Sequence, residues 1–212
     1  MTQIFSIRGV IARGGLAAIT TLLLATPVLA HHPSGGEAPQ NILQGLLSGL
    51  GHPVIGLDHL AFVIAVGLLA AVLNQRAVPI VFLLAAVVGT GLHLAGLNLP
   101  VPELVISGSV LLFGLLTVTH RQLNAPTVMA LAAAAGIFHG YAYGEAVVGA
   151  EPMPLMAYLA GFTLIQGAIA YTAYLLSQRS LNPDRSAGVI PVRQAGFAIC
   201  GAGAAFLGSL LI

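Results

Sequence analysis

Two histidines and an aspartate stand together at the start of a long apolar stretch: His52, Asp58 and His59. Neutral imidazole and carboxylate groups bind divalent metals such as nickel, cobalt, zinc, copper and iron. Seven residues at about 100° each come within about 20° of two helical turns, so both histidines are expected on one helix face. Because Pro53 is expected at the start of the helix, His52 is expected just before it, over the same face or just above it. Asp58 would ligate an ion directly or orient an imidazole. The pattern predicts a metal site.

A second polar group stands in a later apolar stretch. His139 and Tyr143 are four residues apart and share a helical face, and Glu145 follows them. A stripe of glycines in the same stretch lets a neighbouring helix approach closely. The full candidate set for metal binding is His52, Asp58, His59, His93, His139, Tyr143 and Glu145. The other titratable groups considered are interpreted as solvated residues at span ends or in a tail: Glu103, Glu151, His120, His31 and His32.

The composition indicates which solvent surrounds these groups. Of the 212 residues, 58% are hydrophobic and 6% are charged, whereas soluble domains carry about 25% charged residues. We therefore expect an all-α membrane protein whose partners are the lipid bilayer and a metal ion, with no nucleic acid. The chain contains no lysine, which excludes a P-loop, and neither HExxH nor GxSxG occurs. The sequence thus predicts an ATP-independent protein that is not an enzyme. Cys200, in an apolar run, is interpreted as a packing residue.

The first 30 residues have the organisation of a secretory signal peptide. Arg8 and Arg13 precede an apolar stretch over 16–25, and small residues at Val28 and Ala30 fit a cleavage site. An uncleaved anchor helix is the alternative, although the apolar region is short for a full span. The cleaved form would begin outside the cytoplasm.

Apolar runs separated by polar and proline breaks predict six membrane helices. They cover 54–73, 79–97, 102–119, 126–147, 153–177 and 190–211, each near the roughly 20 residues that cross a bilayer. Prolines stand at or near the starts of most of these spans, where a missing N–H costs little. The predicted organisation is a signal peptide at 1–30, an exported segment with a short interfacial helix at 31–53, and a six-helix domain at 54–212.

The arginines predict the orientation. Beyond residue 30, the five arginines all fall in connections on one side: Arg76, Arg121, Arg179, Arg185 and Arg193. Cytoplasmic loops carry the excess positive charge. Both termini are therefore expected on the exported side of a bacterial inner membrane. In this orientation the candidate ligands gather in the outer half of the bilayer.

The two polar groups also resemble the signatures of a known family. The run HPVIGLDH from His52 to His59, followed by Val66-Gly67, resembles the HPxxGxDH and VG pattern of the HupE/UreJ nickel and cobalt permeases. The run FHGYAYGE at 138–145 is similar to that family's FHGxAHG motif and its nearby glutamate. The resemblance covers essentially the whole chain. It implies uptake of nickel first and cobalt second, and supply of a nickel enzyme such as hydrogenase or urease.

Three positions depart from that family pattern. Val63 replaces a frequent methionine, Tyr143 replaces the second histidine of the later motif, and Glu145 follows Gly144 directly instead of after one further residue. Loss of an imidazole removes a strong ligand, so the metal is less well specified than the transport of a metal. Two alternatives stay open: a non-transporting metal-binding accessory protein for a nickel enzyme, and a haem-ligating membrane electron carrier.

Overall fold

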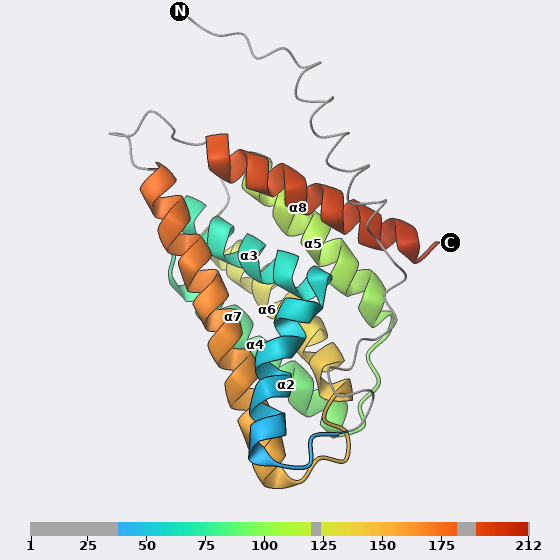
Figure 1. Ribbon diagram of the computed structural model, residues 1–212. Coiled ribbons are helices and arrows are strands. Elements are labelled where there is room, and N and C mark those ends of the chain that lie inside the picture. Colours follow the sequence, from blue (N-terminus) through green and yellow to red (C-terminus); the bar gives the residue numbers. More distant parts are fainter. Residues whose placement is uncertain (1–37, 120–123, 182–189, 212) are drawn as a thin grey trace, which may run out of the picture.

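The computed structural model describes residues 38–119, 124–181 and 190–211. Within these ranges all regular structure is helical, as predicted. The predicted signal peptide, together with His31, His32, His120, Arg121 and Arg185, lies outside the described residues. The helices are α2 (Ile42–Ile55), α3 (Leu57–Val72), α4 (Ala77–Leu94), α5 (Pro102–Thr119), α6 (Ala125–Glu145), α7 (Pro152–Leu181) and α8 (Ile190–Ser209) (Figure 1).

Asparagines and prolines explain where several of these helices begin. The Asn41 side chain accepts a hydrogen bond from the Gln44 N–H at 2.9 Å, and Asn124 accepts one from the Thr127 N–H at 2.8 Å. Each bond satisfies an N–H that has no partner within the helix. Prolines open α5 and α7. The predicted helix starts at 102, 126 and 153 are therefore confirmed to within one residue.

Four of the described helices, α4 to α7, are long and apolar enough to cross a membrane, and α2 with α3 makes a fifth if the bent pair is one span. The sixth predicted span forms α8 but is not among them. Many residues on the outer surface are large and apolar, such as Ile80, Leu84 and Leu164. Such a surface suits lipid, and the protein is a multi-pass membrane protein. The six-span count and the orientation stay predictions.

The first predicted span is broken. A bend of 79° at Gly56 separates α2 from α3, so the prediction that His52 and His59 lie on one face of a single helix is wrong. His52 and Pro53 lie within α2, whereas His59 lies in α3. Gly56 has ψ 99°, an extended value that ends α2. A side chain at Gly56 would come within 2.8 Å of the His59 ring, so glycine permits this close approach.

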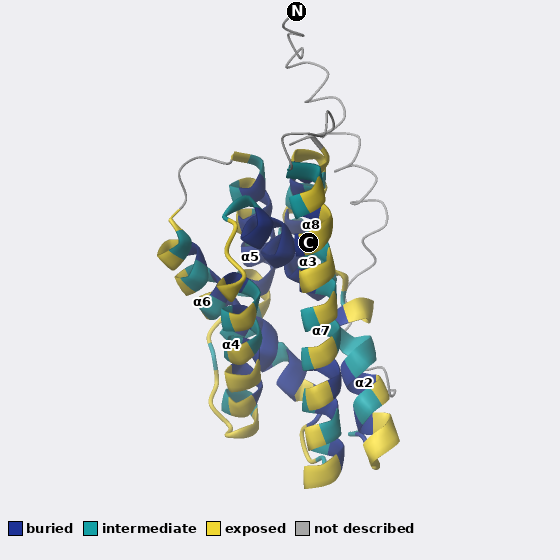
Figure 2. Cartoon of the chain, turned by 90° about the vertical axis from the view of Figure 1, so that its left-hand side faces the viewer, coloured by how far each residue is buried: buried dark blue, intermediate teal, exposed yellow. Residues whose placement is uncertain are grey.

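The helices pack as pairs around α3. α2 and α3 lie along α7, α4 lies against α6, and α5 lies against α8 (Figure 1). The predicted role of the glycine stripe in α6 is confirmed, because a Cβ at Gly136 or Gly140 would strike the backbone of α4. Figure 2 shows the buried residues gathered in the interior and the exposed ones along the outer faces of α4 and α7. α3 supplies much of this core, including the fully buried Phe62 and Leu69.

Candidate metal centre

A pair of buried histidines forms the centre of the site. Nδ1 of His59 on α3 lies 2.7 Å from Nδ1 of His139 on α6, a hydrogen-bonding distance. His59 is 6% exposed and His139 is fully buried. The structure thus brings together residues that are 80 positions apart in the sequence. Two imidazoles buried in an apolar interior are costly unless they are paired, and here each is the other's partner.

His52 joins this pair from the other side of the helix break. Its ring centroid lies 5.9 Å from that of His59 and 5.0 Å from that of Tyr143. Its Nδ1 lies 2.8 Å from the hydroxyl of Tyr158 on α7. On one straight helix, residues seven apart would be displaced by about 10 Å along the axis. The bend at Gly56 therefore brings the two rings closer than the predicted single helix would have done.

Asp58 occupies the first turn of α3. Its Oδ1 accepts a hydrogen bond from the backbone N–H of His59 at 2.8 Å. A carboxylate is favourable at this end of a helix, because the N-terminal N–H groups are unpaired and the helix dipole is positive there. Asp58 thereby fixes the start of the turn that carries His59, and its side chain also lines a cavity.

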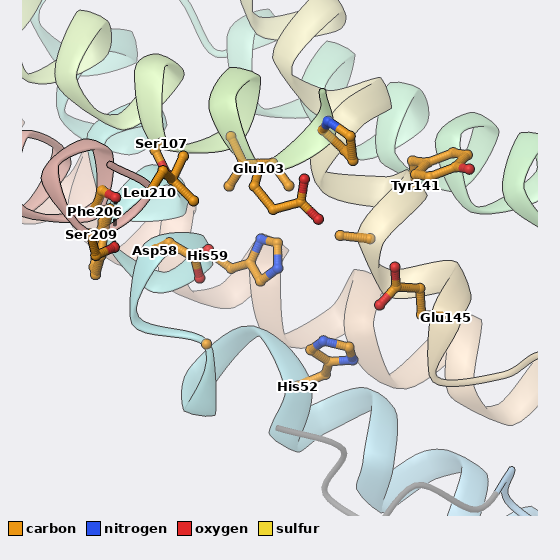
Figure 3. Close-up of a pocket in the computed structure, with 14 residues that line it drawn as sticks. His52, Asp58, His59, Glu103, Ser107, Tyr141, Glu145, Phe206, Ser209 and Leu210 are labelled. Atoms are coloured by element: carbon orange, nitrogen blue, oxygen red, sulfur yellow. Dashed lines mark hydrogen bonds between the residues drawn. The ribbon is translucent and has the colours of Figure 1, made fainter. Parts of the chain in front are cut away.

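That cavity has a volume of about 190 Å³ and lies between the helix break and the ends of α5, α6 and α8. Figure 3 shows the carboxylate ends of Glu103 and Glu145 and the rings of His52 and His59 turned toward the same space. With Asp58, three carboxylates and two imidazoles line one small volume. Such a set of oxygen and nitrogen atoms attracts divalent cations.

Glu103 is a cavity residue that the sequence did not identify. Its place at the start of a predicted span indicates a solvated charge, and the residue is exposed. The structure nevertheless places it on the cavity wall with His52 and His59. The one available signal was its predicted position on the same side of the membrane as the other candidates. Glu145, which was predicted, lies on the opposite wall in Figure 3.

The hydroxyl of Tyr143 is bonded to α7. Tyr143 is fully buried and donates a hydrogen bond to Oε1 of Gln166 on α7 at 3.3 Å. Its ring lies 4.4 Å from the ring of His59. Tyr143 thus packs its ring against His59, while its hydroxyl oxygen is bonded to α7.

His93 lies to one side of the other candidates. Its ring packs 4.4 Å from the ring of Tyr141, and Gly144 lies against it. Nδ1 of His93 is buried without a hydrogen-bond partner among the described residues. It does not line the cavity. The structure therefore separates His93 from the predicted set.

Serine and phenylalanine residues complete the surroundings of His139. The Ser109 hydroxyl on α5 lies 3.0 Å from Nε2 of His139. The Phe62 ring stacks on the His139 ring at 4.2 Å, and Phe113 and Phe82 pack against Phe62. Ser109, Tyr158 and Gln166 lie in apolar runs with no motif to mark them, so their contacts emerge only from the fold. Aromatic rings thus enclose the pair beyond the cavity.

Within residues 38–119, 124–181 and 190–211, no three side chains of His, Cys, Asp or Glu lie close enough together to hold a metal ion. The His59–His139 contact is a hydrogen bond in this geometry, and the carboxylates stand apart across the cavity. Binding an ion by several of these groups would require the hydrogen bond to open or the cavity to narrow.

The fold and the site define a multi-pass helical membrane protein in which a cavity, lined by carboxylates and imidazoles among apolar side chains, adjoins a buried histidine pair. Comparison with known proteins places it further. A family described as HupE / UreJ protein matches residues 19–206. The chain is 33% identical over 198 residues to Protein HupE of Rhizobium leguminosarum bv. viciae, covering 89% of this chain and 96% of that relative. No solved structure matches. The chain belongs to the HupE/UreJ family, as the two motifs predicted.

Proposed function

We propose that this protein is a secondary transporter that takes up a divalent transition-metal ion, nickel first and cobalt second. The observation that supports this most directly is the continuity between the cavity and the buried His59–His139 pair. His59 takes part in both, because it lines the cavity and contacts His139. An ion held by the cavity carboxylates would therefore meet the His59 imidazole within the same cavity, with the His139 imidazole directly behind it.

The residues divide the task by position. Asp58, Glu103 and Glu145 attract the hydrated cation and neutralise its charge as water is lost. His52 and His59 supply nitrogen ligands at the base of the cavity, and His139 supplies the next one. Beyond His139 the aromatic rings around Phe62 must part for the ion to continue, so passage requires a conformational change. In this proposal the protein moves an ion across the membrane and catalyses no reaction.

The cellular setting is part of the same proposal. The cavity opens to the exported side of a bacterial inner membrane, and the imported metal supplies a nickel enzyme such as hydrogenase or urease. The motifs shared with the family, HPVIGLDH and FHGYAYGE, contribute most of the proposed ligands. Tyr143, which the sequence left as a candidate ligand, acts instead through its ring as a wall of the pathway.

The test is uptake of radiolabelled nickel by liposomes that contain only the purified protein. We expect saturable uptake by the wild type and loss of at least about 90% of it in His59→Ala and Asp58→Asn, since each removes a group at the point of capture. The matched control is Glu151→Gln, an exposed carboxylate that does not line the cavity. Equal uptake by all four proteins would refute the assignment.

The same experiment separates the alternatives. A non-transporting accessory protein would bind nickel but accumulate none in liposomes. A haem carrier would show a Soret band when purified. The structure disfavours haem, because His59 and His139 contact each other directly and Phe62 stacks on one face of His139, which leaves no space between the imidazoles for a porphyrin.

A further inference from the structure

The proton of one buried hydroxyl determines how the histidine pair is protonated. The Ser109 oxygen lies 2.7 Å from the backbone oxygen of Ile106 and 3.0 Å from Nε2 of His139. A serine hydroxyl has one hydrogen, and a carbonyl oxygen can only accept. The hydrogen must therefore go to Ile106, since two oxygens at 2.7 Å without a hydrogen between them would repel. Ser109 is then left as an acceptor, and His139 must donate to it from Nε2.

The position of the proton on His139 also determines the position of the proton on His59. A neutral imidazole carries one N–H, and charging a fully buried ring in apolar surroundings is costly. With its proton on Nε2, His139 presents the lone pair of Nδ1. The 2.7 Å contact between the two Nδ1 atoms then requires that His59 carry its proton on Nδ1. Nε2 of His59 is consequently the atom with a lone pair.

The position of the His59 ring shows where that lone pair lies. Its Nδ1 edge faces His139, which does not line the cavity. The opposite edge contains Cδ2 and Nε2. A Cβ built on Gly56 would lie 2.8 Å from Cδ2 of His59, and Gly56 is itself a cavity residue. The Cδ2–Nε2 edge therefore lies on the cavity side.

We infer that Ser109 is a positioning residue that acts through His139 to hold His59 as the Nδ1–H tautomer, with the Nε2 lone pair presented to the cavity. Its meaning for transport rests on the proposed function; the protonation pattern itself does not. Without Ser109 to accept from Nε2, His139 could carry its proton on Nδ1 and donate to His59. His59 would then turn an N–H toward an arriving cation.

An order of ligation follows from this pattern. His59 can bind a cation through Nε2 without losing a proton and without breaking its bond to His139. The Nδ1 lone pair of His139 becomes available only when His59 withdraws its N–H. His59 is therefore the first imidazole of the buried pair to bind, and His139 acts after the ring of His59 has moved.

The direct test is ¹⁵N solid-state NMR of protein labelled at the histidine ring nitrogens, in lipid bilayers without metal. Resonances are assigned with His59→Gln and His139→Gln. We expect the wild type to show protonated Nδ1 in His59 and protonated Nε2 in His139, and Ser109→Thr to keep this pattern. Ser109→Ala should give His59 a substantial Nε2–H population. The inference is overturned if wild-type His59 is protonated on Nε2, or if Ser109→Ala leaves both tautomers unchanged.

Transport provides the second readout. In Ser109→Ala the half-saturating nickel concentration should rise about tenfold, because removal of a group that orients a metal ligand weakens binding by about 10- to 100-fold, and Ser109→Thr should restore it. The control is Thr117→Val, which removes another buried hydroxyl on α5 that bonds only to a backbone oxygen. An equal effect in the control would overturn a specific role for Ser109. Absence of uptake by the wild type, with the expected NMR pattern, would refute the proposed function alone.

Discussion

The contact between α4 and α6 places His139, so a change in helix spacing tests whether the site depends on it. A Cβ at Gly140 would overlap the backbone oxygen of Ala86. Because backbone cannot rotate away as a side chain can, Gly140→Ala should push the two helices apart by about 1 Å or more to restore normal contact. His139 is the adjacent residue and would move with α6.

Three contributions determine how much stability Gly140→Ala should lose. Overpacking costs about 1–3 kcal/mol. Separation of the helices also weakens the 2.8 Å hydrogen bond from the Thr90 hydroxyl to the Gly140 carbonyl, worth about 1 kcal/mol. Replacing glycine by alanine within a helix stabilises the helix by about 1 kcal/mol, which offsets part of this loss. The net loss is about 1–3 kcal/mol. Nickel uptake should fall by more than this loss of stability alone would cause, because ligands function only when they are held within about 0.5 Å of their productive positions.

The assay is unfolding in mild detergent, together with nickel uptake in liposomes. The control is Gly91→Ala on α4, where an added Cβ meets no heavy atom within 4 Å. That variant should equal or exceed the wild type in stability and keep its uptake. If Gly140→Ala were as stable and as active as Gly91→Ala, the close approach of α4 and α6 would not determine the position of His139.

Two further substitutions test the cavity and its wall. Glu103→Gln removes one of the carboxylates that line the cavity. The half-saturating nickel concentration should rise about three- to tenfold in initial-rate uptake measurements, with the maximum rate unchanged, and the difference should shrink as salt is added; a salt-independent loss of maximum rate would contradict this. Tyr143→Phe leaves Oε1 of Gln166 without its donor, so unfolding should show a loss of about 1–2 kcal/mol, while uptake stays within about twofold. A loss of uptake as large as that of His59→Ala would identify the phenol oxygen as a ligand.

Most of the helical architecture could be predicted from local signals. Proline at 102, 126 and 152 and the cap at Asn124 act within one turn, so the starts of α5, α6 and α7 follow from the sequence. The glycine stripe of α6 was also readable, since small residues at this spacing have few roles other than close packing. The sequence did not predict which helix packs on that stripe, because the pairing of α6 with α4 depends on the whole fold.

The helix break shows where local reasoning failed. Apart from Asp58 and His59 the stretch 54–73 is apolar, and no proline or run of polar residues within it marks an interruption at Gly56. On either side of the bend the chain packs on α7: Gly45 and Gly49 lie against Pro154 and Tyr158 near its start, whereas Gly67 lies against Ala170 farther along. Tertiary contacts of this kind override helix propensity, and the glycine at position 56 leaves room for the His59 ring, which a Cβ there would approach to 2.8 Å.

The residues of the candidate site could be proposed from the sequence, whereas their geometry could not. His52, His59 and His139 can be singled out in the sequence, because ionisable groups in apolar helices are rare enough to identify individually. The sequence alone does not tell which of the polar side chains would bind a metal ion and which would orient or enclose the side chains that do. Ser109 and Tyr143 illustrate this: the hydroxyl of a serine in an apolar run orients a histidine, while a tyrosine in a ligand position directs its oxygen elsewhere.

The break at Gly56 also resolves a difficulty in the HPVIGLDH motif. Histidines seven residues apart on a straight helix share a face but stand about 10 Å apart, too far for one ion to contact both at bonding distances near 2 Å. The bend reduces the separation of the ring centroids to 5.9 Å and turns the first turn of α3, with Asp58, toward the cavity. The glycine between the two histidines is therefore as much part of the site as they are: it converts a spacing unsuited to a shared ion into two imidazoles at one cavity.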